Sequence, residues 1–191
     1  MAAKDREHLI RDRERTEAAL IAAARSLVMD RPYESIRVRE IAEVVGCNHG
    51  LITHYFGSKL GLFTQVLHQI GTELNESIGS FATPRELLSH PLTGTYWRLM
   101  AALLEAGLDP DSALSEGPPV VDAILRRGEE LVGRNLEADR RTAAFIVLAV
   151  GGFQVFGQAF TSRIMPSGDP DEAVDAFGRM MQLIVRGLSA E

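Results

Sequence analysis

The sequence predicts an all-α protein of about nine helices. Apolar residues recur at steps of three and four along most of the chain, for example at every fourth position from Leu62 to Ile78, and this spacing places them on one face of a helix. Glycines, prolines and capping residues separate the apolar stretches. No stretch alternates apolar and polar residues for long enough to predict a β-strand.

Three helices are expected within the first part of the chain. An apolar stripe predicts the first over residues 15–29, and Pro32 ends it. The second covers 38–45 and stops at Gly46, a residue suited to a left-handed C-cap. The third is short, covers 48–55, and begins with an asparagine, which is a good N-cap.

The remaining helices are delimited by equally clear signals. Ser58 caps a long helix, and Thr83-Pro84-Arg85-Glu86 is a capping box with proline at the first helical position. The expected ranges are 59–78, 84–90, 96–108, 121–132, 141–161 and 170–188.

The composition is that of a soluble protein of one or two domains. The chain has 191 residues, of which 46% are hydrophobic and 24% are charged. The single cysteine, Cys47, cannot form an intrachain disulfide, and charges of both signs fill the start of the chain, where a signal peptide would be apolar. We therefore expect a cytoplasmic protein.

The acidic charge is unevenly distributed. The net charge is −6, yet residues 1–64 carry ten basic and nine acidic side chains, and the remainder carries ten against seventeen. A small basic patch in the N-terminal part can therefore still meet phosphate. We place a domain boundary near residue 60, between an N-terminal domain over 1–60, with an arm over 1–13, and a C-terminal domain over 61–191.

One segment is apolar enough to resemble a membrane span. Residues 143–161 contain no charge and are nearly long enough to cross a bilayer. Gln154 and Gln158, one helical turn apart, and three glycines interrupt the segment. We favour a helix buried in a bundle or in a subunit interface, with a membrane-associated bundle as the alternative.

The helices over 38–45 and 48–55, joined by a turn at Gly46, predict a helix-turn-helix motif. In that motif the second helix enters the major groove of DNA. Ile52 and Phe56 can face inward, toward Ile41, Ala42 and Val45 of the preceding helix. The residues left to point outward carry hydrogen-bonding groups for the most part, and they are Asn48, His49, Leu51, Thr53 and His54. The alternative is a pair of linking helices whose polar residues face water.

The residues that follow favour the DNA-binding interpretation. Ser58 and Lys59 place a helix N-terminus and a cation together. Free backbone N–H groups and an ammonium form an anion site that suits a phosphate. Gly50 inside the short helix costs about 1 kcal/mol relative to alanine, which is tolerated where a backbone must approach a partner closely.

These residues carry a resemblance to a known family. The stretches "IAEVVG" and "HYFGSK", followed by Leu62-Phe63, resemble the DNA-binding domain of the TetR family of bacterial transcriptional regulators in order and spacing, over residues 14–63. The resemblance implies that Tyr55 and Lys59 contact the DNA backbone. The expected DNA-binding residues are Arg37, Arg39, Asn48, His49, Gly50, Leu51, Thr53, His54, Tyr55 and Lys59.

The chain departs from the family pattern in three places. Arg37 stands where the family has a threonine that caps the second helix, so half of a capping box with Glu40 is missing. His49 replaces a frequent Lys or Arg, and Thr53 a frequent Tyr, so base contacts do not transfer directly. In the N-terminal arm, charges alternate at helical spacing, which predicts a solvated helix or a DNA-contacting arm through Arg11, Arg13 or Arg15.

The resemblance also implies a small-molecule cavity and a homodimer. Helices four to seven would enclose the cavity, and the last two helices would pair with those of a second subunit. The candidate pocket residues are Phe81, Tyr96, Trp97, Met100, Leu104, Phe145, Phe153 and Gln154. The candidate dimer residues are Gly151, Gly152, Phe156, Phe160, Phe177, Met181 and Ile184, with Gly157 as a further site of close approach.

The functional prediction is a repressor that binds a palindromic operator as a dimer and is released by a small, largely apolar effector. The five histidines and Cys47 form no metal-binding or catalytic spacing, so we expect no enzymatic activity, no metal and no cofactor. The alternative is a helical bundle that binds small molecules, or associates with a membrane, without a DNA role.

Overall fold

The structure is a computed structural model that describes residues 3–111, 120–132, 140–164 and 169–187. For some of these residues only the backbone is described, namely 3–11, 128, 131–132, 140–143, 158–164, 170 and 184–187. Nine α-helices and one short 3-10 helix, with no strand, are delimited within the described residues. The all-α prediction is therefore confirmed. The helices are α1 (Ala3–Asp30), η1 (Tyr33–Ser35), α2 (Val38–Val45), α3 (Gly50–Phe56), α4 (Lys59–Ile78), α5 (Pro84–Ser89), α6 (Pro91–Glu105), α8 (Val120–Val132), α9 (Arg140–Ile164) and α10 (Pro170–Gly187).

Two helices begin earlier than the sequence predicts. α1 starts at Ala3, so the N-terminal arm continues the first helix without a break. α6 starts at Pro91, because a proline at the first helical position needs no hydrogen-bond partner for its nitrogen. η1 was not predicted, since three residues are too few to show a period.

Three predicted caps are present, and the N-cap of α3 is His49 instead of the predicted Asn48. Gly46 ends α2 in the left-handed region, at a φ of 73°, which a residue with a Cβ rarely adopts. The Ser58 hydroxyl accepts a hydrogen bond from Gly61 N at 3.0 Å. The Asn48 side-chain oxygen accepts one from Gly50 N at 2.7 Å, and the Thr83 hydroxyl accepts one from the backbone near the start of α5. These bonds satisfy N–H groups that a helix start leaves unpaired.

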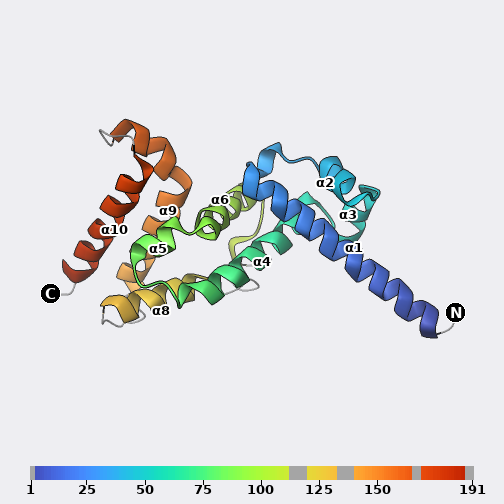
Figure 1. Cartoon of the computed structure of the whole chain (residues 1–191), viewed down its shortest axis with the longest axis horizontal. Helices are drawn as coiled ribbons and strands as arrows, with labels where there is room; N and C mark the ends of the chain where they lie inside the picture. The colour runs from blue at the N-terminus through green and yellow to red at the C-terminus, as the bar shows by residue number, and fades with distance from the viewer. Residues whose placement is uncertain (1–2, 112–119, 133–139, 165–168, 188–191) are drawn as a thin grey trace.

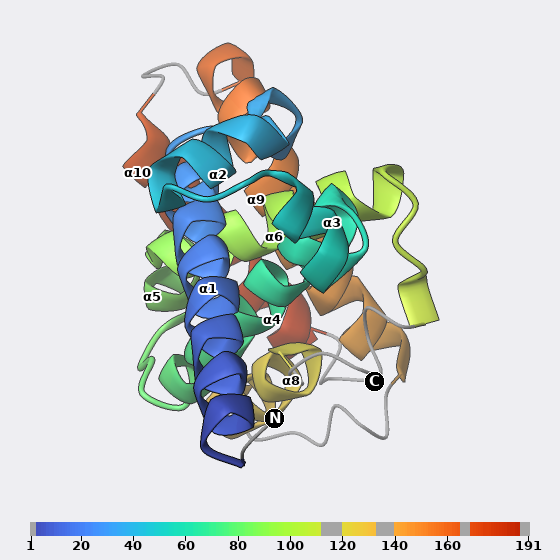
Figure 2. The ribbon, with the colours of Figure 1, turned by 90° about the vertical axis from the view of Figure 1, so that its right-hand side faces the viewer.

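The helices are arranged along the longest axis of the molecule (Figure 1). α1, α2 and α3 lie at one end and α9 and α10 at the other, with α4 and α6 between them. In the turned view, α1 and α2 lie in front of the C-terminal helices (Figure 2). α4 packs on α1 and α3 on one side and on α6 and α8 on the other. α4 thus connects α1 and α3 to α6 and α8, and α6 packs in turn on α9.

One apolar core runs through both ends of the molecule. Leu20 of α1, Ile41 of α2, Ile52 of α3 and Phe63 of α4 are all 0% exposed. Burial of large apolar side chains contributes roughly 1.5–3 kcal/mol each, so these four residues fix the short helices α2 and α3 on the longer α1 and α4. Among the described residues, no helix has the length and hydropathy needed to cross a bilayer.

A bidentate ion pair joins α1 to α4. Both guanidinium nitrogens of Arg25 donate to the carboxylate of Glu73, and this hydrogen bond lowers the pKa of Glu73 from its usual 4.5. A carboxyl group with a depressed pKa stabilises the folded state above its unfolded pKa, and that stability is lost as the pH falls through the folded pKa.

We expect Glu73→Gln to lower the free energy of unfolding at pH 7 by about 0.5–1 kcal/mol, a small value because both side chains are partly exposed to solvent. The difference from the wild-type protein should vanish as the pH falls below the depressed pKa of Glu73. Denaturant unfolding at pH 7 and under acidic conditions measures it. Glu76→Gln, on the exposed face of the same helix, is the control, and an equal loss in both variants at pH 7 would contradict the prediction.

Candidate nucleic-acid interface

The turn between α2 and α3 is tight and well bonded. Cys47 N donates to Ala42 O at 3.0 Å, beyond the left-handed Gly46. The chain then reverses through Asn48, whose backbone oxygen accepts from Leu51 N at 3.0 Å. Ile52 faces the core. The predicted helix-turn-helix is thus formed, with its apolar side held against the rest of the domain.

The other side of α3 faces solvent. Asn48, His49, Thr53 and His54 are exposed, Gly50 is exposed, and Leu51 is half-buried. The Asn48 side-chain oxygen is already bonded to Gly50 N. His49, Thr53 and His54 also lie outward, and they present hydrogen-bonding groups suited to base edges.

Two exposed arginines lie at the start of α2. Arg37 and Arg39 are both exposed, and Arg37 N donates to the Glu40 carboxylate at 2.8 Å. This is the half of the capping box that the sequence retains. The Glu40 carboxylate also accepts a hydrogen bond from Arg31 at 2.9 Å. These two hydrogen bonds lower the pKa of Glu40. The two arginines remain as cations beside the recognition helix.

Lys59 is engaged within the chain rather than free. Its Nζ donates to Tyr33 O at 2.6 Å and lies 3.9 Å from the centroid of the Tyr33 ring. Desolvation by burial lowers the pKa of Lys59. The sequence predicted a free ammonium at the start of α4 as part of an anion site. In the structure this ammonium instead bonds to η1 and holds it against α4. The sequence showed no sign of this contact, because Tyr33 lies far from Lys59 in the chain and in an unpredicted turn.

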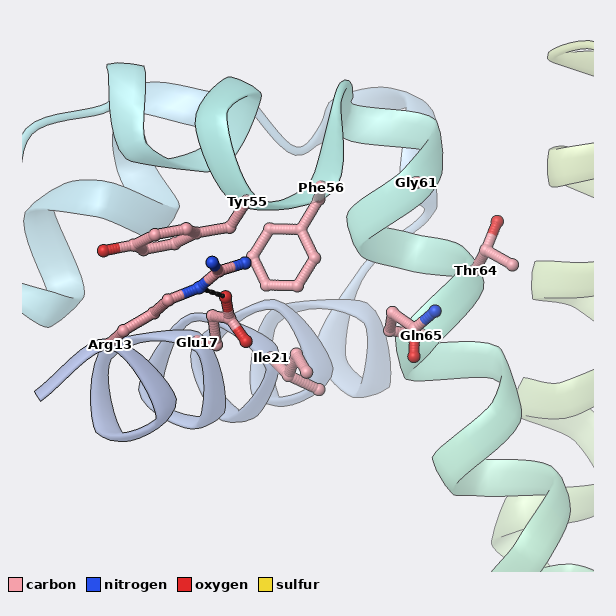
Figure 3. Close-up of a pocket in the computed structure, with 8 residues that line it drawn as sticks. All are labelled: Arg13, Glu17, Ile21, Tyr55, Phe56, Gly61, Thr64 and Gln65. Carbon is pink, nitrogen blue, oxygen red and sulfur yellow. Dashed lines mark hydrogen bonds and ion pairs between the residues drawn. The ribbon is translucent and has the colours of Figure 1, made fainter. Parts of the chain in front are cut away.

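A hollow of about 410 Å³ lies behind the end of the recognition helix (Figure 3). Arg13 and Glu17 of α1 form its lower edge, and Tyr55 and Phe56 of α3 lie above them. The Arg13 guanidinium is 5.4 Å from the centroid of the Tyr55 ring, and its Nε donates to Glu17 at 2.7 Å. Of the three arm arginines, Arg13 contacts α3, Arg15 is exposed, and the Arg11 side chain lies outside the described residues.

The expected pocket residues divide into two groups. Phe81, Tyr96 and Met100 are buried, and burial raises the pKa of Tyr96 to about 12. Trp97, Phe153 and Gln154 are half-buried, and Gln154 Nε2 donates to Leu88 O at 2.8 Å. Leu104 and Phe145 are 39% and 42% exposed, so their place in a pocket stays a prediction. Both lie on outward-facing positions of amphipathic helices.

The expected dimer residues also divide. Gly152 is half-buried with open space around its Cα, and Phe156 is 58% exposed. Three others pack within the chain. A Cβ on Gly151 would lie 3.0 Å from the Trp97 ring, Phe177 stacks on Phe153 at 4.3 Å between centroids, and Met181 is 8% exposed. The Phe160 and Ile184 side chains lie outside the described residues. Gly157 packs on Phe153 of its own helix.

Apolar residues that the sequence reasoning missed form the exposed face of α9 and α10. Leu148 on α9 is 74% exposed, and Met180 and Leu183 on α10 are 59% and 69% exposed. Their spacing in the sequence places them on shared helix faces. Leu148 is one turn from Gly152 and two turns from Phe156, and Met180 and Leu183 are three residues apart. No group of three or more metal-ligating side chains was found among the described residues.

Comparison with known proteins places this architecture in a family. A family model described as bacterial regulatory proteins, tetR family, matches residues 20–66. The HTH-type transcriptional repressor Rv3405c of Mycobacterium tuberculosis is 31% identical over 137 residues, which are 70% of this chain and 72% of the relative.

Two solved structures share the fold. NalD of Pseudomonas aeruginosa, the secondary repressor of the MexAB-OprM multidrug efflux pump, is 18% identical with a TM-score of 0.52, over 90% of this chain and 95% of that one. A TetR-family regulator from Streptomyces coelicolor is 18% identical with a TM-score of 0.51, over 93% and 89%. The family-model match and the sequence relative, together with the α2–turn–α3 geometry, show that this chain belongs to the TetR family of helix-turn-helix transcriptional regulators.

Proposed function

We propose that the chain is a cytoplasmic repressor that binds a palindromic operator as a homodimer and is released by a small-molecule effector. The observation that carries the DNA-binding part is the two-sided character of α3. Ile52 is 0% exposed on the inner side, and His49 and Thr53 are exposed on the outer side. A helix of seven residues is held by its neighbours, so its outer side is available to the major groove.

The roles within this interface follow from chemistry and exposure. Arg37 and Arg39 supply charge for phosphates, and the Tyr55 hydroxyl adds a neutral donor at the end of α3. His49 and Thr53 read base edges. Lys59 donates a hydrogen bond to Tyr33 O and so positions η1. Its positive charge also attracts the DNA phosphates, without a direct contact.

The exposed face of α9 and α10 supports the dimer. Leu148, Phe156, Met180 and Leu183 are each more than half exposed, and α9 packs on α10. Several large apolar side chains exposed on two packed helices indicate an interaction surface. A twofold pair joined there would present two copies of α3 to half-sites about 34 Å apart, one turn of DNA.

Control by an effector rests on α4. This helix contacts α1 and α3 at the DNA-binding end and α6 and α8 at the other. A molecule bound near α6 that moves α4 would change the separation of the two recognition helices. For a near-complete switch the effector must bind the non-DNA form more tightly by ~5 kcal/mol. Equal affinity for the free and the operator-bound protein would remove this part of the proposal.

Selection of bound fragments from native genomic DNA tests the central claim. Specific binding should survive competitor DNA, weaken steeply as salt rises, and return a sequence with twofold symmetry. Enrichment of no common sequence would refute the operator, and would leave a helical bundle without a DNA role as the interpretation to pursue.

Reading and anchoring residues should respond differently to substitution. Arg39→Ala should weaken binding to all sequences alike and reduce the slope of log affinity against log salt by about one. His49→Ala should cost about 1–3 kcal/mol on the preferred operator and change the ranking of operator variants. Competition gel shifts over single-base variants at several salt concentrations measure both. Identical behaviour of the two substitutions would contradict the assigned roles.

A further inference from the structure

The N-cap and the first two turns of α6 contain three buried polar atoms that have no hydrogen-bond partner. They are Nδ1 of His90, Oγ1 of Thr93 and Nε1 of Trp97. Thr93 itself is 0% exposed. Buried polar groups in native proteins are nearly always hydrogen-bonded, and an exception requires an explanation. All three exceptions lie within eight residues, from the N-cap of α6 to its second turn.

These three atoms belong to one face of α6. His90, Thr93 and Trp97 are separated by three and four residues, and side chains at that spacing are neighbours on a helix surface. The face is turned toward α9. A Cβ on Gly151 would lie 3.0 Å from the Trp97 ring, and a Cβ on Gly94 would lie 3.1 Å from Gln154 Oε1. Trp97 therefore lies at the seam between α6 and α9, and Thr93 lies one turn from it on the same side of α6.

Aromatic surfaces and an exposed cation adjoin the hydrogen-bonding groups of the seam. Phe81 lies against His90, with 5.3 Å between ring centroids, and Phe153 of α9 stacks on Phe177. The Arg98 guanidinium folds back over Gly94, where a Cβ would lie 2.8 Å from its Nη1. An indole N–H is a donor only, and a guanidinium is a donor and a cation. Both groups select for an acceptor, and the charge of Arg98 favours an anionic one.

We propose that the effector of this regulator is an apolar molecule carrying a carboxylate, which binds in the seam between α6 and α9. The carboxylate accepts hydrogen bonds from Trp97 Nε1 and the Thr93 hydroxyl and lies near the Arg98 guanidinium, and the apolar body packs on Phe81 and Phe153. This assignment rests on the proposed effector control and gives the effector a chemical class. Because α6 packs on α4, occupation of the seam acts on the helix that carries the recognition unit.

Trp97 is the only tryptophan of the chain, so its fluorescence reports directly on the seam. The test titrates the full-length protein with 4-phenylbutanoate and, separately, with 4-phenylbutylammonium, two probes of matched body and opposite charge. A saturable change with the carboxylate and none with the ammonium supports the proposal. No saturable change with the carboxylate, or an equal response to both probes, overturns it.

Two threonines of α6 provide a matched pair of variants. Thr95 is also buried, at 4% exposure, and its hydroxyl donates to Pro91 O at 3.2 Å. Thr93→Val removes an unpartnered hydroxyl and should weaken 4-phenylbutanoate binding about tenfold, without lowering the melting temperature. Thr95→Val removes a partnered hydroxyl and should lower the melting temperature, with unchanged probe affinity. The reverse pattern would show that the Thr93 hydroxyl is structural and would overturn the assignment.

The proposed DNA binding is measured independently, on the wild-type protein without any probe. Specific operator binding together with no carboxylate response would refute this inference alone. A carboxylate response together with no specific DNA binding would refute the proposed operator function and leave a carboxylate-binding helical protein. The two failures are therefore distinguishable.

Discussion

Gly61→Ala is expected to be among the most damaging single-methyl additions in this protein. A Cβ at this position would lie 2.0 Å from the carbonyl oxygen of Phe56 and 3.2 Å from its carbon. Both are backbone atoms and cannot rotate away, so α4 must move from the end of α3. We expect a loss of roughly 3 kcal/mol in the free energy of unfolding, toward the upper end for overpacking, and a melting temperature ~6–12 °C lower.

Gly79, at the other end of α4, is the matched control. It has helical dihedrals, at a φ of −60° and a ψ of −24°, and a Cβ added there would meet no atom within 4 Å. Gly79→Ala should leave stability unchanged or raise it slightly, because alanine restricts the unfolded chain. Thermal unfolding of both variants checks the pair. A similar melting temperature for the two variants would contradict the prediction, because the backbone at the junction of α3 and α4 would then accommodate the added methyl group at little cost. In the expected case, Gly61→Ala also weakens DNA binding, since the recognition helix loses its fixed position.

Leu148→Asp is the second substitution with a large expected effect. If the exposed face of α9 and α10 is the dimer surface, the twofold axis brings two carboxylates into an apolar contact, and unpaired buried charges cost several kcal/mol. We expect dissociation to monomers and operator affinity lower by at least about a hundredfold. Sedimentation or light scattering measures the oligomeric state, and gel shift measures the affinity. Leu183→Asp on α10 should have the same consequence.

Val44→Asp is the control for the oligomeric state. Val44 is a 67% exposed apolar residue of α2, at the opposite end of the molecule from α9 and α10 (Figure 1). Its substitution should leave the dimer intact. A protein that stays dimeric with Leu148→Asp, or becomes monomeric with Val44→Asp, would relocate the subunit contact.

The local elements were largely predictable because their signals are local. Gly46, Ser58 and Thr83 each act on a backbone group within a few residues, and the structure confirms these three caps. Asn48 lies one residue before the N-cap of α3, which is His49. The inward position of Ile52 also follows from helical period alone. Such features need no knowledge of the tertiary fold.

The contacts that escaped prediction join residues far apart in the chain. Lys59 donates to Tyr33 O across 26 positions, and Arg25 pairs with Glu73 across 48. The periodic pattern identifies an apolar face but not which neighbour covers it. For that reason the sequence did not reveal that Met181 is buried within the chain or that Phe177 stacks on Phe153. The sequence also did not predict that only glycine fits at position 61, because this depends on the position of the Phe56 carbonyl group.

The bond between the Lys59 ammonium and the Tyr33 carbonyl has a mechanical consequence. Lys59 is the first residue of α4, and Tyr33 opens the turn that leads into α2. A tilt of α4 would therefore also displace the segment that leads into α2. Arg37 and Arg39 lie at the start of α2, so under the proposed function a movement of α4 would displace these phosphate-binding side chains and α3 at the same time.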